Sequence, residues 1–400
     1  MKKKLAVLCG VYYPEPSPTG LCVKKFVDLL QDDFDIDILC IAKNGVAETV
    51  CREDGAVIHT LTCRRLEKEM RATGMKRNVL HLFGAAQIKL RLLGNLSWLK
   101  KAYTEKLCEL SAKQPYDAVF SVCSPFAAHV AAKDYRASHP SVHWCAYTVD
   151  PYAAKNRIRP VGVSFRRLCA AERETLCKAD SLLLSEEVFC HRKDLYAGHP
   201  DCQPLPYILP ATGCVGGERA YFDKDDINCV YAGRFYEDIR NPETMLKVFS
   251  SLEDSRIKLH LFSVGCEEIV CRYQQQCPNI LVHDPVPHDE IAKVYRDADI
   301  LVNVTNTVEE FLPSKTFEYI ALCKPIVDFC AAAENRELAR YPLCLQIRHG
   351  NGEDAAAVRE FVTKSRGKTV SDMQITEIYR KNTKACVKEI LRKAILREAF

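Results

Sequence analysis

The chain has 400 residues, of which 48% are hydrophobic, and a formal net charge of +4 at pH 7. This length exceeds what a single hydrophobic core usually supports, so we expect two domains of about 200 residues each. The small net charge argues against a protein whose main partner is nucleic acid, and no apolar run reaches the roughly 18 residues that a membrane-spanning helix needs.

The cysteines and the first residues bear on the cellular compartment. The 21 cysteines are spread through predicted strands and helices, and their odd number favours reduced side chains over a disulfide framework. No C-x-x-C pair occurs, so we expect no metal site. The opening MKKKLAVLCGVYYPEPS reaches prolines too early for a signal peptide, and we therefore expect a cytoplasmic protein.

The first half of the chain alternates short apolar runs with segments of helical length. The runs occupy residues 5–13, 36–42, 56–61, 117–122, 142–149 and 181–185. Continuous apolar runs of this kind are typical of parallel strands covered by helices on both faces. We therefore predict a doubly wound α/β domain over residues 1–206.

A change of composition follows. Residues 207–226, YILPATGCVGGERAYFDKDD, are rich in Gly, Pro and Asp and are predicted to form a linker. A second doubly wound domain is predicted over residues 227–374, and residues 375–400 are predicted to form a packing helix. Two such domains leave a cleft at the carboxyl ends of their sheets, where open α/β sheets bind ligands. The apolar runs of the second domain lie at 227–233, 257–265, 279–286, 299–304, 325–330 and 343–347.

One loop of the second domain carries two arginines. A predicted strand ends at Gly233 and a predicted helix begins at Asn241, so Arg234 and Arg240 bracket the loop at the carboxyl edge of the sheet. Guanidinium groups are planar and permanently charged, and two that converge suit a diphosphate. The alternative interpretation is a pair of solvated surface arginines.

A second loop, EEFLPSKTFEYIALCKPIV (residues 309–327), runs into a predicted helix that begins at about Ser314. The N–H groups at a helix start bind anions, and Ser314 and Lys315 add a hydroxyl group and a positive charge there. Glu310 and Glu318 would repel phosphates, but they can accept hydrogen bonds from hydroxyl groups on either side of a diphosphate. A ligand with hydroxyls, a diphosphate and further hydroxyls is a nucleotide sugar.

The spacing of Glu310 and Glu318, with seven residues between them, closely resembles the donor-binding signature of retaining GT-B glycosyltransferases of family 4. The loop with Arg234 and Arg240 resembles the basic loop of that family, in which Gly-Arg is followed six residues on by Lys or Arg. The stretches VYYPEPSPTG, TVDPY, LFSVG and NILVHDPVPHDEIAKVYRDADILVNVT are also similar. The resemblance covers most of the chain and is firmest over residues 227–330. It implies a GT-B fold of two Rossmann-like domains facing a central cleft.

The resemblance also implies roles for these residues. Glu310 would approach the transferred sugar, and Glu318 would hold the ribose hydroxyls of the donor. Arg234 and Arg240 would neutralise the leaving diphosphate, assisted by the Ser-Lys pair at the helix start. The family requires no metal and no cofactor, and the helix dipole and the arginines would supply the positive charge.

Two positions depart from the family pattern. The N-terminal loop, which is expected to approach the ligand at Gly20, has Leu21 where a second glycine is common. Cys323 stands where Gly usually precedes Lys-Pro. If that position needs a positive φ, a residue other than Gly costs about 1 kcal/mol there.

Acceptor recognition is expected in the first domain, where two polar residues follow predicted strand ends. His129, in SVCSPFAAHVAAK, suits either a structural role in a helix or a polar contact or base near the acceptor. Asp150, in TVDPY, suits either an acceptor-site residue or a turn before Pro151. Residues 64–106 hold eleven Lys or Arg and three Glu. They form either a solvated helical face or a surface that lies on an anionic membrane near a lipid-linked acceptor.

These observations predict a cytoplasmic, peripheral glycosyltransferase that moves a sugar from a nucleotide-diphosphate sugar to a saccharide or lipid-linked acceptor. Retention of the anomeric configuration, independence of metals and a role in surface polysaccharide assembly are expected from the resemblance. The expected partners are the nucleotide sugar, the acceptor and the inner face of an anionic membrane, and not nucleic acid. Two alternatives remain: a nucleotide-sugar epimerase on the same fold, and a non-catalytic relative that binds nucleotide sugars.

Overall fold

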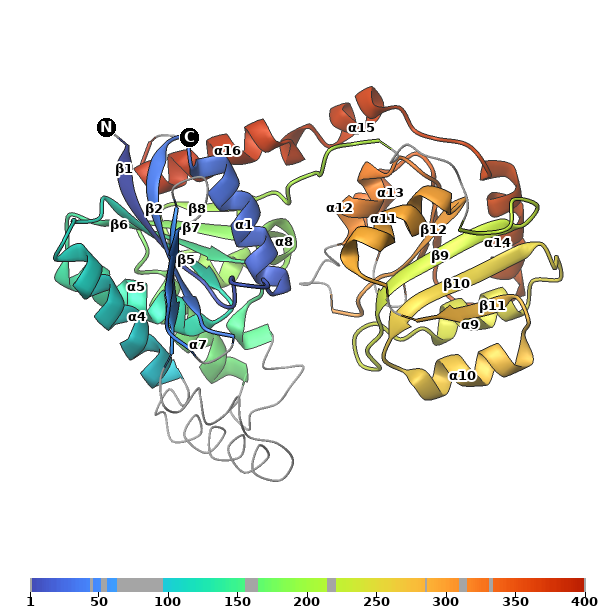
Figure 1. The fold of residues 1–400 in the computed structure, drawn as a ribbon, viewed down its shortest axis with the longest axis horizontal. Helices are drawn as coiled ribbons and strands as arrows, with labels where there is room; N and C mark the ends of the chain where they lie inside the picture. The colour runs from blue at the N-terminus through green and yellow to red at the C-terminus, as the bar shows by residue number, and fades with distance from the viewer. Residues whose placement is uncertain are drawn as a thin grey trace. The chain divides into compact units, whose positions relative to one another are not determined.

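The computed structural model describes residues 2–43, 46–51, 56–62, 96–154, 165–213, 221–284, 286–308, 315–330 and 334–398. The chain forms two compact units, each built on its own sheet (Figure 1). The first unit contains Met1–Tyr207 together with Lys384–Phe400, and the second contains Ile208–Thr383. The last helix of the chain therefore belongs to the first unit.

The sheet of the first unit has the strand order β3-β4-β2-β1-β5-β6-β7-β8, in which only the β3–β4 pair is antiparallel among the described strands. Its strands are β1 (Lys3–Leu8), β2 (Phe34–Ile41), β3 (Thr49–Cys51), β4 (Val57–Leu61), β5 (Ala118–Cys123), β6 (His143–Thr148), β7 (Ser181–Ser185) and β8 (Cys202–Leu205). The helices are α1 (Pro18–Leu30), α4 (Leu96–Ser111), α5 (Phe126–Ser138), α7 (Phe165–Leu176), α8 (Glu186–Arg192) and α16 (Lys384–Leu396), with the 3-10 helix η1 (Lys193–Tyr196).

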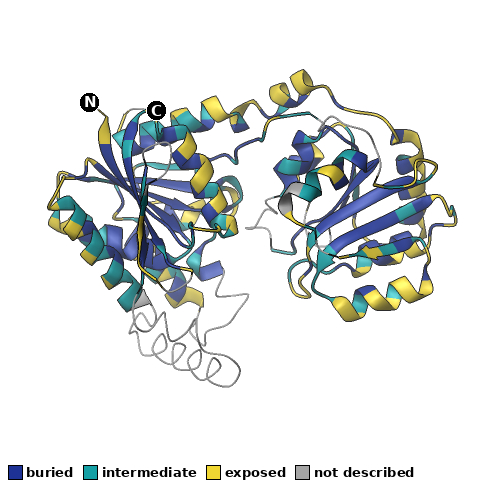
Figure 2. Cartoon of the chain, viewed as in Figure 1, coloured by how far each residue is buried: buried dark blue, intermediate teal, exposed yellow. Residues whose placement is uncertain are grey.

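The central strands of this sheet are buried on both faces, as Figure 2 shows by their dark blue colour. Every residue of β5 is buried, and β1 is buried from its second residue onward. Helices cover both faces, so a strand gains stability from apolar side chains at consecutive positions and not only at alternate ones. This is why the strands of the first half are visible in the sequence as continuous apolar runs.

The second sheet has the order β11-β10-β9-β12-β13-β14, with all described pairs parallel. Its strands are β9 (Ile227–Arg234), β10 (Ile257–Val264), β11 (Ile280–His283), β12 (Ile300–Val304), β13 (Ile326–Phe329) and β14 (Cys344–Ile347). The helices are α9 (Glu243–Ser250), α10 (Glu267–Gln276), α11 (His288–Asp297), α12 (Lys315–Ala321), α13 (Arg336–Ala339), α14 (Gly352–Ser365) and α15 (Asp372–Ile378), with η2 (Arg380–Asn382). The strand order reverses at β9, and in such sheets ligands bind at the carboxyl ends of the strands that flank this switch point.

These two sheets confirm the predicted fold class. Two short strands were absent from the prediction, and both have weak signals. β3 has three residues and pairs only with β4, while β8 contains Pro204, which favours an edge position.

The C-terminal segment differs from the single predicted helix over residues 375–400. The structure has α15, the short η2 and then α16. The break has a physical reason, because the backbone of Thr383 is extended, with ψ 149°, and the carbonyl of Asn382 bonds outside any helix. The hydroxyl of Tyr379 donates to the carbonyl of Glu337 at 2.7 Å, and the carbonyl of Asn382 accepts from the N–H of Leu209 at 2.8 Å.

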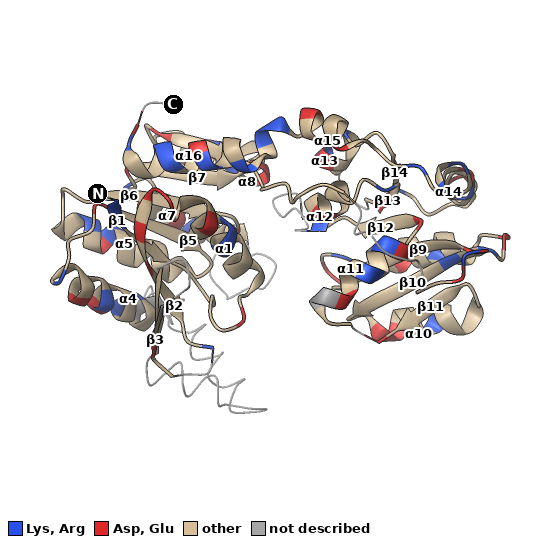
Figure 3. Cartoon of the chain, turned by 45° about the horizontal axis from the view of Figure 1, so that its top comes forward, with Lys and Arg blue, Asp and Glu red and all other residues tan. Residues whose placement is uncertain are grey.

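Most of the basic stretch at residues 64–106 lies outside the described residues, which begin again at Leu96 with α4. Within α4, basic residues alternate with acidic ones (Figure 3). Lys101 lies 3.7 Å from Glu105, and Lys106 lies 3.0 Å from Glu109. In this described part, the cations are balanced by neighbouring carboxylates. None of the helices in the described ranges is long and apolar enough to cross a membrane.

Candidate functional site

Three basic residues, Arg234, Arg240 and Lys315, lie at the carboxyl end of β9 or bond to its backbone there, and we call them the basic cluster. Arg234 is the exposed last residue of β9. The chain then turns back, because the N–H of Arg240 donates to the carbonyl of Tyr236 at 2.8 Å and the N–H of Tyr236 donates to the carbonyl of Arg240 at 3.1 Å. The guanidinium of Arg240 donates to the carbonyl of Arg234 at 3.4 Å. The structure thus brings the two predicted arginines together.

The loop between these arginines is attached to the segment that follows β12. Nε of Arg240 donates to Oδ1 of Asn306 at 3.0 Å, and the N–H of Thr307 donates to the carbonyl of Ile239 at 2.8 Å. Asn306 is 7% exposed, so its amide oxygen gives the guanidinium a fixed partner. Arg240 is therefore held in a defined position at the edge of the sheet.

Lys315, the first residue of α12, points back to β9. Its ammonium donates to the carbonyl of Ala232 and to the hydroxyl of Tyr295, the latter at 3.2 Å. Burial lowers the pKa of Lys315, the charge of Glu318 raises it and the charge of Arg240 lowers it again. The ammonium and the guanidinium of Arg240 are thus close enough to repel each other, which makes this edge favourable for an anion.

Glu318 lies one turn further along α12 and is half-buried. The helix is fixed beside β9 at this point, because the N–H of Ala232 donates to the hydroxyl of the buried Tyr319 at 3.4 Å. The rings of Tyr319 and Tyr295 pack edge to face at 5.4 Å between centroids. Glu318 is therefore a carboxylate acceptor carried by a well-anchored helix next to the basic cluster.

Glu310 and Ser314 lie outside the described residues, which resume at Lys315. Their roles at the sugar and at the diphosphate stay predictions from the sequence.

The end of β10 forms another part of the same edge. Gly265 has a φ of +90°, and a Cβ at this position would lie 2.5 Å from the carbonyl oxygen of Phe235. The N–H of Phe235 donates to the carbonyl of Val264 at 2.9 Å. A side chain at residue 265 would therefore force apart β10 and the loop that carries Arg240.

Gly20 lies in the first turn of α1 and is buried. A Cβ on Gly20 would lie 2.2 Å from the carbonyl oxygen of Val11, and the N–H of Gly20 donates to Oγ of Ser17 at 3.1 Å. The glycine thus lets the loop after β1 pack closely on the start of α1. This packing explains structurally why residue 20 is a glycine. Its place near a ligand stays a prediction.

Asp150 follows β6 at the carboxyl edge of the first sheet and is half-buried. The next residues are fixed by the buried carboxylate of Glu172, which accepts from the N–H groups of Tyr152 and Ala153 at 3.1 and 3.0 Å and from the hydroxyl of Tyr196 at 3.0 Å. Burial raises the pKa of Glu172, although these donors oppose the shift. Glu172 thus shapes the turn in which Asp150 lies.

His129 is fully buried in α5. The indole N–H of Trp144 donates to Oγ of Ser121 at 2.8 Å, so the hydroxyl proton of Ser121 is directed to Nδ1 of His129, also at 2.8 Å. Nε2 faces the hydroxyl of Thr148 at 3.5 Å. Burial lowers the pKa of His129 to about 3, so the ring is neutral at physiological pH. These contacts favour the structural alternative for His129 over a base near the acceptor.

Cys323 has a φ of 59°, so the position that was considered for a positive φ does adopt one. The thiol is buried, and the Cys323 carbonyl accepts from the N–H of Val370 at 2.9 Å. This bond attaches the end of α12 to the segment before α15. The turn that follows α12 is therefore stabilised by the fold despite the strain of a Cβ in the left-handed region.

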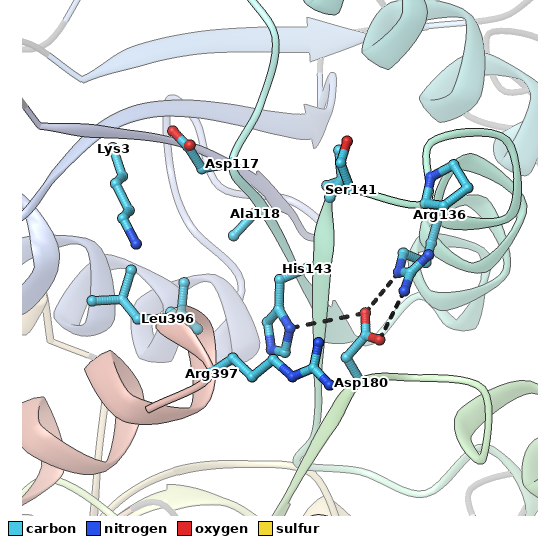
Figure 4. A pocket seen from close by; sticks show the side chains of 12 residues that line it. Lys3, Asp117, Ala118, Arg136, Ser141, His143, Asp180, Leu396 and Arg397 are labelled. Carbon is cyan, nitrogen blue, oxygen red and sulfur yellow. Dashed lines mark hydrogen bonds and ion pairs between the residues drawn. The ribbon is translucent and has the colours of Figure 1, made fainter. Parts of the chain in front are cut away.

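A polar cavity of about 260 Å³ lies in the first unit at the amino ends of β5 and β6 (Figure 4). Asp180 accepts from Nε and Nη2 of Arg136 at 2.8 and 3.1 Å. Nε2 of His143 lies 2.8 Å from the carbonyl of Ala394 in α16, and because a carbonyl only accepts, this nitrogen carries the proton. The cavity is at the opposite edge from the strand ends that bind ligands in open sheets. Of its polar groups, His143 attaches α16 to β6.

Three residues that support these positions were not found by sequence reasoning: Asn306, Tyr295 and Glu172. Each comes from a segment distant in sequence from the residue it contacts. The signal available for Asn306 was weak, namely a polar residue soon after a predicted strand. Glu172 lies in a predicted helix with other charged residues, and nothing in its spacing distinguishes it. Across the described ranges, no group of three or more His, Cys, Asp or Glu side chains could hold a metal ion.

Residues 226–354 match the family model described as "Glycosyl transferases group 1". This segment includes the whole basic cluster and Glu318. No curated protein matches the chain in sequence.

Solved structures match the chain over almost its full length. Sucrose-phosphate synthase from Thermosynechococcus elongatus aligns with a TM-score of 0.73 and 13% identity over 98% of each chain. The structure described as "Trehalose-6-phosphate from E. coli bound with UDP-2-fluoro glucose" aligns with a TM-score of 0.67 and 13% identity over 99% of each chain. The lipopolysaccharide outer core galactosyltransferase WaaB, in its apo form, aligns with a TM-score of 0.61 and 11% identity over 99% of this chain and 100% of that one. The chain thus has the GT-B fold, and the fold and the family match together support a glycosyltransferase.

Proposed function

We propose that this protein transfers a sugar from a nucleotide-diphosphate sugar to a saccharide or lipid-linked acceptor, with retention of the anomeric configuration. The observation that carries the proposal is the basic cluster. Its three cations lie around the carboxyl end of β9, next to the switch point of the sheet and inside the segment that matches the family model. A diphosphate is the ligand whose charge and oxygen atoms suit two guanidinium groups and an ammonium.

The proposed chemistry depends on the leaving group. As the bond between the anomeric carbon and the diphosphate breaks, negative charge develops on the diphosphate oxygens. Arg234, Arg240 and Lys315 would stabilise that charge, which removes the need for a metal ion. Glu318 would accept hydrogen bonds from the ribose hydroxyls, and Glu310 would face the sugar. Ser314 would add a donor next to Lys315.

The acceptor is assigned to the first unit. Asp150 is half-buried at the carboxyl edge of the first sheet, in a turn that Glu172 shapes, and could accept hydrogen bonds from sugar hydroxyls. We place His129 behind this turn as a neutral residue that orients Thr148, and Gly20 at the loop after β1. The similarity to a lipopolysaccharide galactosyltransferase supports a surface saccharide as the acceptor. We further propose that the transfer takes place at the inner face of the membrane.

A thermal-shift screen tests the donor site. The purified protein is mixed with UDP, GDP, UDP-glucose, GDP-mannose and NAD, and UDP-glucose is the first probe because one similar structure contains a UDP sugar. We expect one nucleotide class to raise the melting temperature and both Arg234→Ala and Glu318→Ala to abolish the increase. NAD should have no effect. If no nucleotide raises the melting temperature, the proposed function is wrong.

Product analysis then separates this function from the alternatives. The protein is incubated with the selected nucleotide sugar, with and without saccharide acceptors. Sugar transfer only in the presence of an acceptor supports the proposal. Release of a free epimerised sugar without an acceptor would instead indicate an epimerase.

A further inference from the structure

Asp328, in the middle of β13, is a fully buried carboxylate that the proposed chemistry does not use. Its Oδ1 accepts from Nδ2 of Asn303 at 2.7 Å and from the hydroxyl of Thr305 at 2.8 Å. Its Oδ2 accepts from Nε2 of Gln346 at 3.1 Å. All three partners are neutral, and among the described residues hydrogen bonds are what compensates this carboxylate. Burial raises the pKa of Asp328 to about 6, against the effect of these donors.

The hydrogen bonds continue from Asp328 to α12. Because the hydroxyl of Thr305 donates to Asp328, its oxygen is free to accept, and Nδ2 of Asn335 donates to it at 3.2 Å. Nδ2 of Asn335 also lies 3.4 Å from the hydroxyl oxygen of Thr316, in the first turn of α12. We call these four residues the Asp328 network.

The members of this network have little freedom to move. Asn335 is 2% exposed and Thr316 is fully buried. Oδ1 of Asn335 accepts from the N–H of Leu338 at 3.2 Å, which caps α13, and the Asn335 carbonyl accepts from Gln346 at 3.0 Å. Gln346 thus bonds to both Asp328 and Asn335. A buried network of this kind is costly when one partner is lost, so it fixes its end residues firmly.

The first turn of α12 is therefore held from two sides. On one side, Lys315 and Tyr319 bond to the two polar groups of Ala232 in β9. On the other side, Thr316 bonds to Asn335. Thr316 stands between Lys315 and Glu318 in sequence, so a shift or rotation of the helix at Thr316 would move both functional side chains.

We propose that Asp328 is a positioning residue for the donor site, which acts through Thr305 and Asn335 on Thr316 and so sets where Lys315 and Glu318 lie. This inference rests on the proposed function for its effect on nucleotide-sugar binding. Its structural part, the coupling between Asp328 and the first turn of α12, does not depend on that function. A purely structural carboxylate would change the stability of the second unit without a specific effect on α12.

The coupling is tested by hydrogen–deuterium exchange on the full-length protein. The variants are Asp328→Asn and Thr316→Val, which both nearly preserve side-chain volume. The matched control is Asp299→Asn, because Asp299 is also buried in the second unit and accepts from the N–H of Asn228 at 3.0 Å, at the amino ends of β9 and β12. We expect the amides of α12 to exchange at least tenfold faster in both test variants at pH 7.5, and at the wild-type rate in the control.

The effect on the donor site is tested by measuring the Kd of UDP-glucose for the same variants. We expect Asp328→Asn and Thr316→Val to raise the Kd at least tenfold, Asp299→Asn to leave it within twofold, and Thr316→Ser to restore it to within threefold of wild type. Rescue by serine would show that the hydroxyl group, and not the volume of the side chain, is required.

The outcomes are distinguishable. Wild-type α12 exchange in both test variants would overturn the positioning role, whatever the Kd values are. Faster α12 exchange with an unchanged Kd would also overturn it, because the helix would then not govern the site. If the wild-type protein binds no nucleotide sugar, the proposed function fails, and the exchange rates alone decide whether Asp328 positions α12.

Discussion

The two sheets share a strand order that reverses once, and the two units place different chemistry at the carboxyl edge. In the first sheet the order reverses at β1, and in the second it reverses at β9. At the carboxyl edge of the second sheet, the basic cluster presents cations to an incoming anion. At the carboxyl edge of the first sheet, His129 is neutral, and the carboxylate of Glu172 accepts hydrogen bonds from backbone N–H groups. We infer that topology sets the edge at which each unit would bind a ligand, and that the residues after the strands set which ligand it suits.

The largest expected effect concerns the neutrality of His129. Its pKa is lowered from 6.5 to about 3 in the folded protein. On acidification the unfolded state therefore takes up the proton first, and stability present above pH 6.5 is lost as the pH falls towards 3. The loss for this group is up to roughly 5 kcal/mol. Urea denaturation between pH 3 and 7 measures the unfolding free energy as a function of pH. In His129→Gln, the part of this pH dependence that comes from His129 should be absent. A slope equal to that of wild type would mean that His129 is accessible to protons in the folded state.

The next effect concerns the basic cluster at the carboxyl edge of the second sheet. Arg240→Ala removes a cation and the bond to Asn306, and we expect the affinity for UDP-glucose to fall by about 10²- to 10³-fold, or about 3–4 kcal/mol, because the diphosphate loses one partner of a hydrogen-bonded charge pair. Isothermal titration calorimetry measures this change. The matched control is Arg256→Ala, which removes an exposed arginine paired with Asp254 just before β10, at the opposite edge of the same sheet. Equal losses in both variants would indicate a general charge effect and not a site.

The third prediction concerns Asp328, whose contribution to stability falls as the pH rises, whereas that of His129 falls as the pH decreases. Asp328 has a pKa raised from 3.8 to about 6, so the folded state holds its proton more tightly than the unfolded state. This group favours folding most below pH 3.8, and its contribution is lost as the pH rises through 6, by up to about 3 kcal/mol. The difference in unfolding free energy between wild type and Asp328→Asn should therefore change between pH 4 and 7. A constant difference would mean that Asp328 does not titrate in this range.

The smallest effect concerns the loop after β1. In Gly20→Ala the new methyl group would meet the carbonyl of Val11 at 2.2 Å, and we expect a loss of about 1–3 kcal/mol from the strain of overpacking. Gly198→Ala is the control, since a Cβ there has no neighbour within 4 Å, and it should change stability by less than 1 kcal/mol. Thermal denaturation compares the two. Equal stability of both variants would contradict the close packing of the loop on α1.

The fold was predictable because strands that are buried on both faces of a sheet have apolar residues at consecutive positions. β5, with all six residues buried, is visible in the sequence, whereas β3, with three residues at an edge, is not. Cys323 was also informative, since its place before Lys-Pro indicated the turn that the structure realises with a φ of 59°.

The candidate site was predictable only in part. The convergence of Arg234 and Arg240 follows from a short loop after one strand, so local sequence was sufficient. The partner of Arg240 is Asn306, 66 positions away. The Asp328 network and its further partners come from β12, β13, β14 and the N-cap of α13. Such contacts depend on which strands become neighbours, and this information is absent from any short stretch of sequence. The roles of Glu310 and Ser314 stay predictions, because they lie outside the described residues.

The membership of α16 in the first unit has a consequence for biosynthesis. The ribosome makes the residues of β1 to β8 first, but α16, which covers β5, β6, β7 and β8 and also contacts α1, is made only after the whole second unit. Until then, the apolar surface that Val387, Leu391 and Ile395 will cover faces water. The first unit can therefore complete its fold only after the second unit has been synthesised. A fragment that ends at Tyr207 should aggregate unless residues 384–400 are supplied in trans.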